Sequence, residues 1–394
     1  MDFPVYAGKF KIMIRFILFI IILILSLVNF FPVPTKETWY AGIAVSEFPW
    51  VFILAIIGLL VWTILSPTLR IPNLFIGIVT LIILCYPIIR SYMIGSDLEQ
   101  RLEKSFGIKS NDIKGFQQEK PFSFLQMLTG NGAKTIPFKT YQFAKHEGVD
   151  LALNFSTSAI SGIRPCLIVV HGGSWKRGDN SEIAAANNYF ANAGYHVATV
   201  NYRLAPKFHS PAPQEDLHAA FAWLRKHAVD LKIDTNNFLL MGRSAGGQIV
   251  LTMAYTGNEN GVKGVAAFYG PNDMLWSYDH PTKMAIMDSR MVQRDFLGGA
   301  PHEVPERYFA ESPLFHVTSE TVPTLLIHGK NDAHVYYEQS VRLAKKLDEY
   351  KVKNMLLTLP WATHGCEYNL NGPAGQLSIF SQERFFYSVT QMGK

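Results

Sequence analysis

The sequence predicts an α/β protein with a mostly parallel sheet, preceded by three transmembrane helices. After residue 138, short β-branched or apolar runs alternate with amphipathic helical patterns, which is typical of a parallel sheet covered by helices on both faces. Before residue 90, three long segments are apolar and almost free of charge. We therefore predict, in order, a three-helix transmembrane region, a linker with short helices, an α/β domain and a cap-like insertion within that domain: 1–90, 91–137, 138–394 and 274–321.

The three apolar segments are 11–31, 48–67 and 71–89. Each has about 20 residues, and a helix that rises about 1.5 Å per residue then matches the roughly 30 Å of a hydrocarbon core. The alternative for the first segment is a secretory signal, because basic residues precede it. Its apolar run is too long for a signal, no small-x-small cleavage site follows, and two similar segments come next. We therefore predict a multi-pass integral membrane protein.

The basic residues that flank these segments are nearly balanced between the two sides of a membrane. The first helix usually dominates the orientation, and long domains translocate regardless of their charge. We therefore favour a cytoplasmic N-terminus and an α/β domain on the non-cytoplasmic side.

Charge and cysteine content exclude few classes of partner. The net charge of +5 is spread along the chain without a run of like charges, which gives nucleic-acid binding little support. The three cysteines, Cys85, Cys166 and Cys366, have no spacing that suggests a zinc site or a disulfide framework. Neither redox compartment is therefore excluded.

The α/β domain begins with two alternating runs over 140–155 that meet at Glu147-Gly148, which predicts a β-hairpin. A helical pattern over 181–194 has Ser181 as its expected N-cap. Further helices are predicted at 215–228, 244–255 and 337–350. They alternate with strands predicted at 165–170, 196–202, 238–242, 262–269, 323–329 and 355–360.

The strand and helix on either side of Ser244 meet in Gly-Arg-Ser-Ala-Gly, a G-x-S-x-G pattern at 242–246. The pattern alone is weak, but a serine at a strained strand-to-helix turn holds its hydroxyl clear of the sheet. The helix that begins there also directs free N–H groups and the positive end of its dipole toward developing negative charge. Ser244 is therefore the candidate nucleophile.

A serine hydroxyl needs a base, and the base needs an orienting acid. In this kind of sheet both follow later strands, in the order Ser, Asp, His. Asp332 follows the strand at 323–329 and His364 follows the next strand, so we assign them as acid and base. A turn-forming Asp and an ordinary loop His are the alternatives. Asp273 is the rival acid, and we interpret His328 and His334 as structural or rim residues.

Acyl transfer also requires hydrogen-bond donors for an oxyanion. The strand at 165–170 ends in His-Gly-Gly-Ser-Trp, where two successive glycines allow backbone N–H groups to face the site. We assign Gly172 and Gly173 to this oxyanion hole, together with the N–H of Ala245 after the nucleophile. A glycine turn without catalytic meaning is the alternative.

The motifs HGGSW, YRLAP, GRSAGG, NDAHV and THG, in this order, resemble the α/β-hydrolase superfamily, specifically the hormone-sensitive-lipase-like and feruloyl-esterase-like carboxylesterases. The resemblance begins near Ile136. It implies that His171 is mainly structural and that Arg203 pairs with an acid such as Asp216. Arg243 departs from the lipase-like branch, which often has an acid there. The run HGGSWKRGD also resembles arylformamidases and prenylcysteine methylesterases, so the substrate stays open.

We therefore expect a membrane-anchored serine carboxylesterase that needs no metal or organic cofactor and whose partners are an ester substrate and the lipid bilayer. An acyltransferase or an arylformamidase-like amidohydrolase is the alternative, and a scaffold without activity is the least favoured. The oligomeric state is not predicted. A chain starting near Ser91 keeps every candidate residue, so we expect it to fold and to cleave small soluble esters. In the insertion, either these side chains line an acyl pocket or the helices are plain surface: Trp276, Tyr278, Met284, Met287, Met291 and Phe296.

Overall fold

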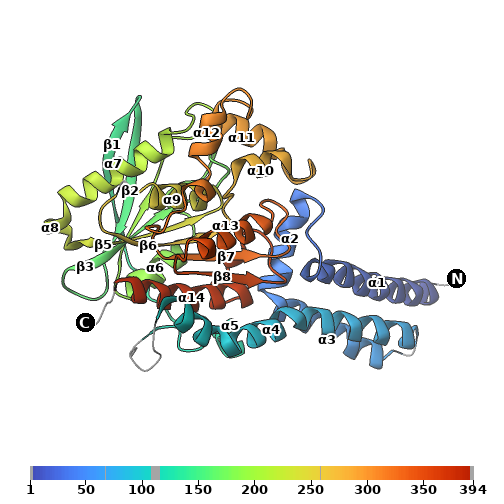
Figure 1. Cartoon of the computed structure of the whole chain (residues 1–394). Helices are drawn as coiled ribbons and strands as arrows, with labels where there is room; N and C mark the ends of the chain where they lie inside the picture. Colours follow the sequence, from blue (N-terminus) through green and yellow to red (C-terminus); the bar gives the residue numbers. More distant parts are fainter. Residues whose placement is uncertain (1–2, 67, 108–115, 258, 391–394) are drawn as a thin grey trace.

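The computed structural model describes residues 3–66, 68–107, 116–257 and 259–390. Its centre is an eight-stranded sheet with the strand order β1-β2-β4-β3-β5-β6-β7-β8 (Figure 1). The neighbouring pairs from β4 through β3 to β8 are parallel, whereas β2 is antiparallel to both β1 and β4. The strands are β1 Phe138–His146, β2 Val149–Ser156, β3 Arg164–Val170, β4 His196–Val200, β5 Ile233–Arg243, β6 Val262–Phe268, β7 Thr324–Gly329 and β8 Asn354–Leu359.

The sheet confirms the predicted hairpin and the six predicted strands, with end shifts of a few residues. Glu147 and Gly148 join β1 to β2 with φ of 48° and 79°, the left-handed pair that a tight hairpin turn needs. The helices of the α/β domain are α6 Ala184–Asn192, α7 Ala212–Lys226, α8 Ala228–Leu231, α9 Ala245–Tyr255, α10 Met274–Asp279, α11 Ser289–Leu297, α12 Pro305–Ala310, α13 Glu338–Glu349 and α14 Pro373–Thr390.

Helices cover both faces of the sheet, because each buried strand alternates its apolar side chains between two cores. In β3, Ile168 belongs to the core under α7, α9 and α13, whereas Leu167 belongs to the core under α6 and α14. The expected cap Ser181 is wrong. Its hydroxyl donates to Asp179, and Ile183 occupies the position before α6.

The described chain before residue 107 forms the helices α1 Phe3–Ser26, α2 Lys36–Glu47, α3 Pro49–Ile64 and α4 Arg70–Phe106, with a short turn η1 Leu27–Asn29 after α1. In Figure 1, α1, α3 and the first part of α4 extend away from the sheet as a bundle, and α2 lies between that bundle and the sheet. Among the described residues, α4 is one helix long and apolar enough to cross a membrane. The pair α2 and α3, bent by 82°, makes a second if it is counted as one span. Three separate spans are therefore not confirmed.

Helix α4 continues for 37 residues, about 55 Å at the usual rise, and does not end where the apolar segment ends. Its second half lies against the sheet's helical layer, where Leu98, Leu102 and Phe106 are part of the same core as α14. The chain therefore does not become a linker at Ser91, as the change in composition suggested. The charged face of 91–106 is the solvent side of an amphipathic helix.

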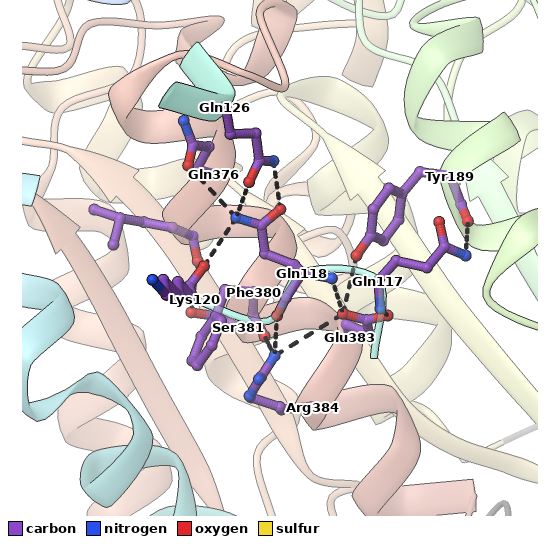
Figure 2. Close-up of polar contacts among 11 residues, drawn as sticks. Gln117, Gln118, Lys120, Gln126, Tyr189, Gln376, Phe380, Ser381, Glu383 and Arg384 are labelled. Carbon is purple, nitrogen blue, oxygen red and sulfur yellow. Dashed lines mark hydrogen bonds and ion pairs between the residues drawn. The ribbon is translucent and has the colours of Figure 1, made fainter. Parts of the chain in front are cut away.

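The rest of the predicted linker includes α5 Phe124–Thr129, and its described part is bound to α14 by a buried polar network (Figure 2). The carboxylate of Glu383 accepts hydrogen bonds from the backbone N–H groups of Gln117 and Gln118 and from the hydroxyl of Tyr189. Arg384 donates to the carbonyl of Gln118 at 3.1 Å, and burial lowers the pKa of Arg384 to about 10. This part of the chain is therefore fixed across α14 rather than free.

Candidate active site

Ser244 lies at the turn between β5 and α9 with φ 53° and ψ −121°, a conformation that costs a non-glycine residue energy. The glycines on either side make this turn possible. A Cβ on Gly242 would lie 2.2 Å from the carbonyl oxygen of Gly246, and one on Gly246 would lie 2.3 Å from that of Val170. The local sequence therefore forces the serine into the strained, outward-facing position that the pattern predicted.

His364 and Asp332 come together at the carboxyl ends of β8 and β7. Nδ1 of His364 lies 2.7 Å from Oδ2 of Asp332. The other carboxylate oxygen, Oδ1, accepts from the backbone N–H groups of His334 and Val335. Burial by itself raises the pKa of Asp332, but the charge of His364 and hydrogen bonds from His328 and His364 outweigh it and hold that pKa well below its usual range. Asp332 is thus a fixed anion that orients one ring nitrogen of His364.

The rival acid Asp273 has other partners. It accepts the N-terminal hydrogen bond of α10 from Trp276 and lies 2.6 Å from Nη2 of Arg342. His328, interpreted as structural, is fully buried, with Nδ1 2.8 Å from the hydroxyl of Ser340 and Nε2 3.3 Å from Asp332. His328 and His364 thus both lie against the same carboxylate oxygen of Asp332, Oδ2.

Ser244 and His364 line the same cavity, which has a volume of about 350 Å³. No hydrogen bond joins the Ser244 hydroxyl to the His364 ring in this conformation, and such bonds often tighten only with substrate bound. The cavity is lined by residues of the α/β domain and by two residues of α2: Trp39, Tyr40, Gly172, Gly173, Ser174, Arg177, Gly178, Glu182, Arg243, Ser244, Tyr269, His334, His364 and Tyr368.

The three N–H groups assigned to the oxyanion hole differ in whether they are free to bind an oxyanion. The N–H of Gly172 donates to the carboxylate of Glu182 at 2.9 Å, so it is occupied, contrary to the prediction. A Cβ on Gly172 would lie 3.1 Å from the carbonyl oxygen of Arg243, so a larger residue there would require a small shift of this backbone. The N–H groups of Gly173 and Ala245 have no hydrogen-bond partner among the described residues. Gly173 lines the cavity, and Ala245 directly follows the nucleophile at the start of α9.

Arg243 is buried directly before the nucleophile, where the resembling family often has an acid. Its Nε lies 3.0 Å from the carboxylate of Glu367, an ion pair without hydrogen-bond alignment. Glu367 also accepts from the hydroxyl of Tyr269, whose ring centroid lies 4.2 Å from that of His364. Burial raises the pKa of Glu367, although Arg243 and Tyr269 oppose that shift. The loop after His364 thus supplies the counter-ion of the buried Arg243.

The pairing of Arg203 with Asp216 is confirmed, since Arg203 donates to this fully buried carboxylate through its backbone N–H at 2.7 Å and through Nε at 2.9 Å. His171 stacks on Tyr202 with ring centroids 4.4 Å apart and bonds within its own loop. His171 therefore braces the turn that carries the two glycines, whereas Arg203 fixes its own segment to α7.

The insertion at 274–321 forms α10, α11, α12 and the short turn η3 Pro313–His316, and it does not line this cavity in the described structure. Met287 comes near, with its sulfur 3.6 Å from the hydroxyl of Ser174. The wall expected from the insertion is formed by Trp39 and Tyr40 of α2 instead. No sequence motif signalled these two residues, whereas His334 and Glu367 lie within three residues of the predicted acid and base.

The BD-FAE family profile matches residues 153–347, just under half of the chain. The chain is 23% identical over 245 residues to the "Probable carboxylic ester hydrolase LipM" and 28% identical over 215 residues to "Esterase LipC", both of Mycobacterium tuberculosis. These alignments cover 58% and 51% of this chain, and 56% and 53% of the relatives. The chain therefore spans about half the length of these curated relatives.

Among solved structures, the chain resembles "Bacterial Heroin Esterase" with a TM-score of 0.57 at 21% identity, over 67% of this chain and 87% of that one. This likeness confirms the predicted α/β-hydrolase fold. The names of the two curated relatives describe enzymes that hydrolyse esters.

Proposed function

We propose that the protein is a membrane-anchored serine hydrolase that cleaves carboxylic esters. The observation that carries the proposal is the strained Ser244 in one cavity with His364, whose Nδ1 lies 2.7 Å from the buried Asp332. The esterase names of the relatives support the same chemistry. The volume of about 350 Å³ is at the lower end of ligand pockets and suits a small ester.

In the proposed mechanism, His364 takes the proton of the Ser244 hydroxyl while the oxygen attacks the ester carbonyl. The N–H groups of Gly173 and Ala245 stabilise the oxyanion. His364 then protonates the leaving alcohol, and the acyl group stays on Ser244. Water, deprotonated by His364, attacks the acyl-enzyme and releases the acid and the free serine. Asp332 keeps the imidazole in the tautomer that these steps require.

A serine probe tests this proposal directly. Because the triad acts as a unit, Ser244→Ala and His364→Ala should each lower ester hydrolysis by about 10⁶-fold while the protein stays folded. A fluorophosphonate should label the wild type and not Ser244→Ala. Turnover retained in Ser244→Ala would overturn the proposal. Product analysis with added acceptor alcohols distinguishes hydrolysis from acyl transfer, and a panel of esters with increasing acyl length defines the pocket.

The membrane part of the proposal rests on apolar side chains that the fold leaves uncovered. Large exposed residues follow one another along the bundle, and in water they would have no partner. They are, with exposed fractions of 43–82%, Ile21, Ile24, Leu54, Ile57, Val61, Ile71, Phe75, Ile78, Ile82 and Ile89. We infer that α1, α3 and the first part of α4 lie in a bilayer.

The orientation of the bundle follows from its two ends. The start of α1 and the end of α3 lie at the end away from the sheet (Figure 1). There the buried guanidinium of Arg15 donates to the carbonyl oxygens of Trp62 and Thr68. Three crossings would then place the α/β domain on the opposite side of the membrane from the N-terminus.

Extraction and proteolysis test this arrangement. The protein should stay with membranes in high salt and carbonate and should need detergent for release. Protease added outside sealed cells or vesicles of native orientation should reach the α/β domain without detergent. Release by carbonate would contradict the anchoring, and full protection of the domain would reverse the orientation without changing the chemistry.

A further inference from the structure

Helix α2 forms part of the cavity wall although it ends more than 120 residues before the first candidate catalytic loop, which begins at His171. Trp39 and Tyr40 line the cavity. An apolar cluster that includes Trp39 joins this segment to the insertion and to the loop that carries Asp332. Its buried members are Val33, Trp39, Ile43, Ile286 and Ala333. Helix α2 therefore contacts the insertion and the loop after β7 that carries Asp332.

Trp39 makes a direct contact with the backbone of the candidate base. Its Nε1 donates to the carbonyl oxygen of His364 at 2.7 Å, and the side chain is buried at 7% exposure. The Trp39 ring also lies 4.6 Å from that of His334, which stacks at 5.0 Å on the ring of His364. Trp39 is thus in contact with His364 both through its backbone and through the neighbouring imidazole.

The other end of α2 is bound to the chain both before and after His364. The buried carboxylate of Glu47 accepts from Nε1 of Trp361 at 3.2 Å and from the backbone N–H of Ala374 at 2.9 Å, at the start of α14. The carbonyl oxygen of Glu47 accepts from Asn369 at 2.7 Å. Apart from one short turn, Cys366–Tyr368, the described chain between β8 and α14 has no regular structure, so these contacts fix its path.

We propose that α2 positions the catalytic histidine, with Trp39 as the positioning residue and Glu47 as its anchor. The proposal rests on the proposed function. A carbonyl that accepts a buried indole N–H cannot rotate freely, and the adjoining imidazole is then held at one angle between Asp332 and Ser244. Proton transfer depends steeply on such an angle, whereas binding of a small ester does not. The contact should therefore act on kcat more than on KM.

The test compares Trp39→Phe with Trp62→Phe in the full chain, purified in detergent. Trp39→Phe keeps an aromatic ring against His334 but removes the N–H donor to His364. Trp62→Phe makes the same change in α3, away from the cavity, and keeps the backbone carbonyl that accepts from Arg15. For p-nitrophenyl acetate, we expect Trp39→Phe to lower kcat about tenfold with KM changed less than about twofold, as for the loss of one buried hydrogen bond. Trp62→Phe should match the wild type.

Fluorophosphonate labelling separates positioning from unfolding. A misplaced histidine slows labelling by about the same factor as kcat but leaves the final labelled fraction unchanged, whereas unfolding lowers the labelled fraction. Should Trp39→Phe not accumulate, Glu47→Gln disturbs the same loop from its other end and should again lower kcat at constant KM. Wild-type kcat in a folded Trp39→Phe, or a rise in KM alone in either variant, would overturn the proposal. If the wild type itself shows no turnover that depends on Ser244, the proposed function is refuted instead.

Discussion

The carboxyl edge of the sheet and helix α2 both line the cavity around Ser244, but different forces hold them there. Ser244, Asp332 and His364 each follow a strand within a few residues, so the hydrogen-bonded ladder fixes where their backbones emerge. Helix α2 has no ladder to the sheet. It is held by side-chain contacts of Trp39 and Glu47. The groups that react are thus placed by the fold itself, and the groups that hold the base are placed by packing between distant segments.

The largest expected effect concerns the acid at the carboxyl edge of the sheet. Asp332→Asn should lower kcat about 10⁴-fold, because an amide favours the wrong tautomer of the histidine in such a triad. Asp273→Asn is the matched control. It removes a buried carboxylate that caps α10 and pairs with Arg342, so it should lower the melting temperature but leave kcat per labelled serine nearly unchanged. The opposite ranking of the two variants would move the acid to the loop after β6.

This contrast also explains what the sequence could and could not predict. The strands, the hairpin and the turn at Ser244 follow from period-two apolar runs, from glycines and from loop order, all of which are local signals. Nothing local marks Trp39, because an indole in an amphipathic helix near a membrane is also typical of an interfacial anchor. Similarly, the polar composition after Ser91 indicated a linker, whereas α4 continues there as an amphipathic helix on the sheet layer. Contacts across hundreds of residues decided both cases.

A chain without α2 tests whether this helix is needed for catalysis. The catalytic loops all lie beyond Ser91, which led to the expectation that a chain starting there is active on small soluble esters. That chain lacks Trp39 and Glu47, and it leaves the carbonyl of His364 and the start of α14 without their partners. We now expect its kcat to be lower by about 100-fold, roughly the product of two lost buried hydrogen-bonding groups. The full chain in the same detergent is the reference, and the labelled fraction measures folding.

A kcat equal to that of the full chain would show that α2 contacts the site without contributing to catalysis. A short chain that labels poorly and melts early would show that α2 is needed for folding as well as for positioning. Adding back a peptide over 31–48 should then recover part of the labelled fraction, because it contains both contact residues.

The smallest expected effect concerns His334, which lies where the two regions meet. Burial, with the charge of the neighbouring His364, lowers the pKa of His334 from 6.5 to about 4. Between these values the unfolded chain binds more protons than the folded one, so stability is greatest above pH 6.5 and decreases as the pH falls toward 4.

His334→Asn removes this titration. Its melting temperature should fall by a few degrees less than that of the wild type between pH 7 and pH 5, as followed by circular dichroism in detergent. Exposed His302→Asn is the control and should keep the wild-type slope. An unchanged slope in His334→Asn would mean that the imidazole is not held neutral between Trp39 and His364, and that the packing of α2 on the site is looser than the ring distances indicate.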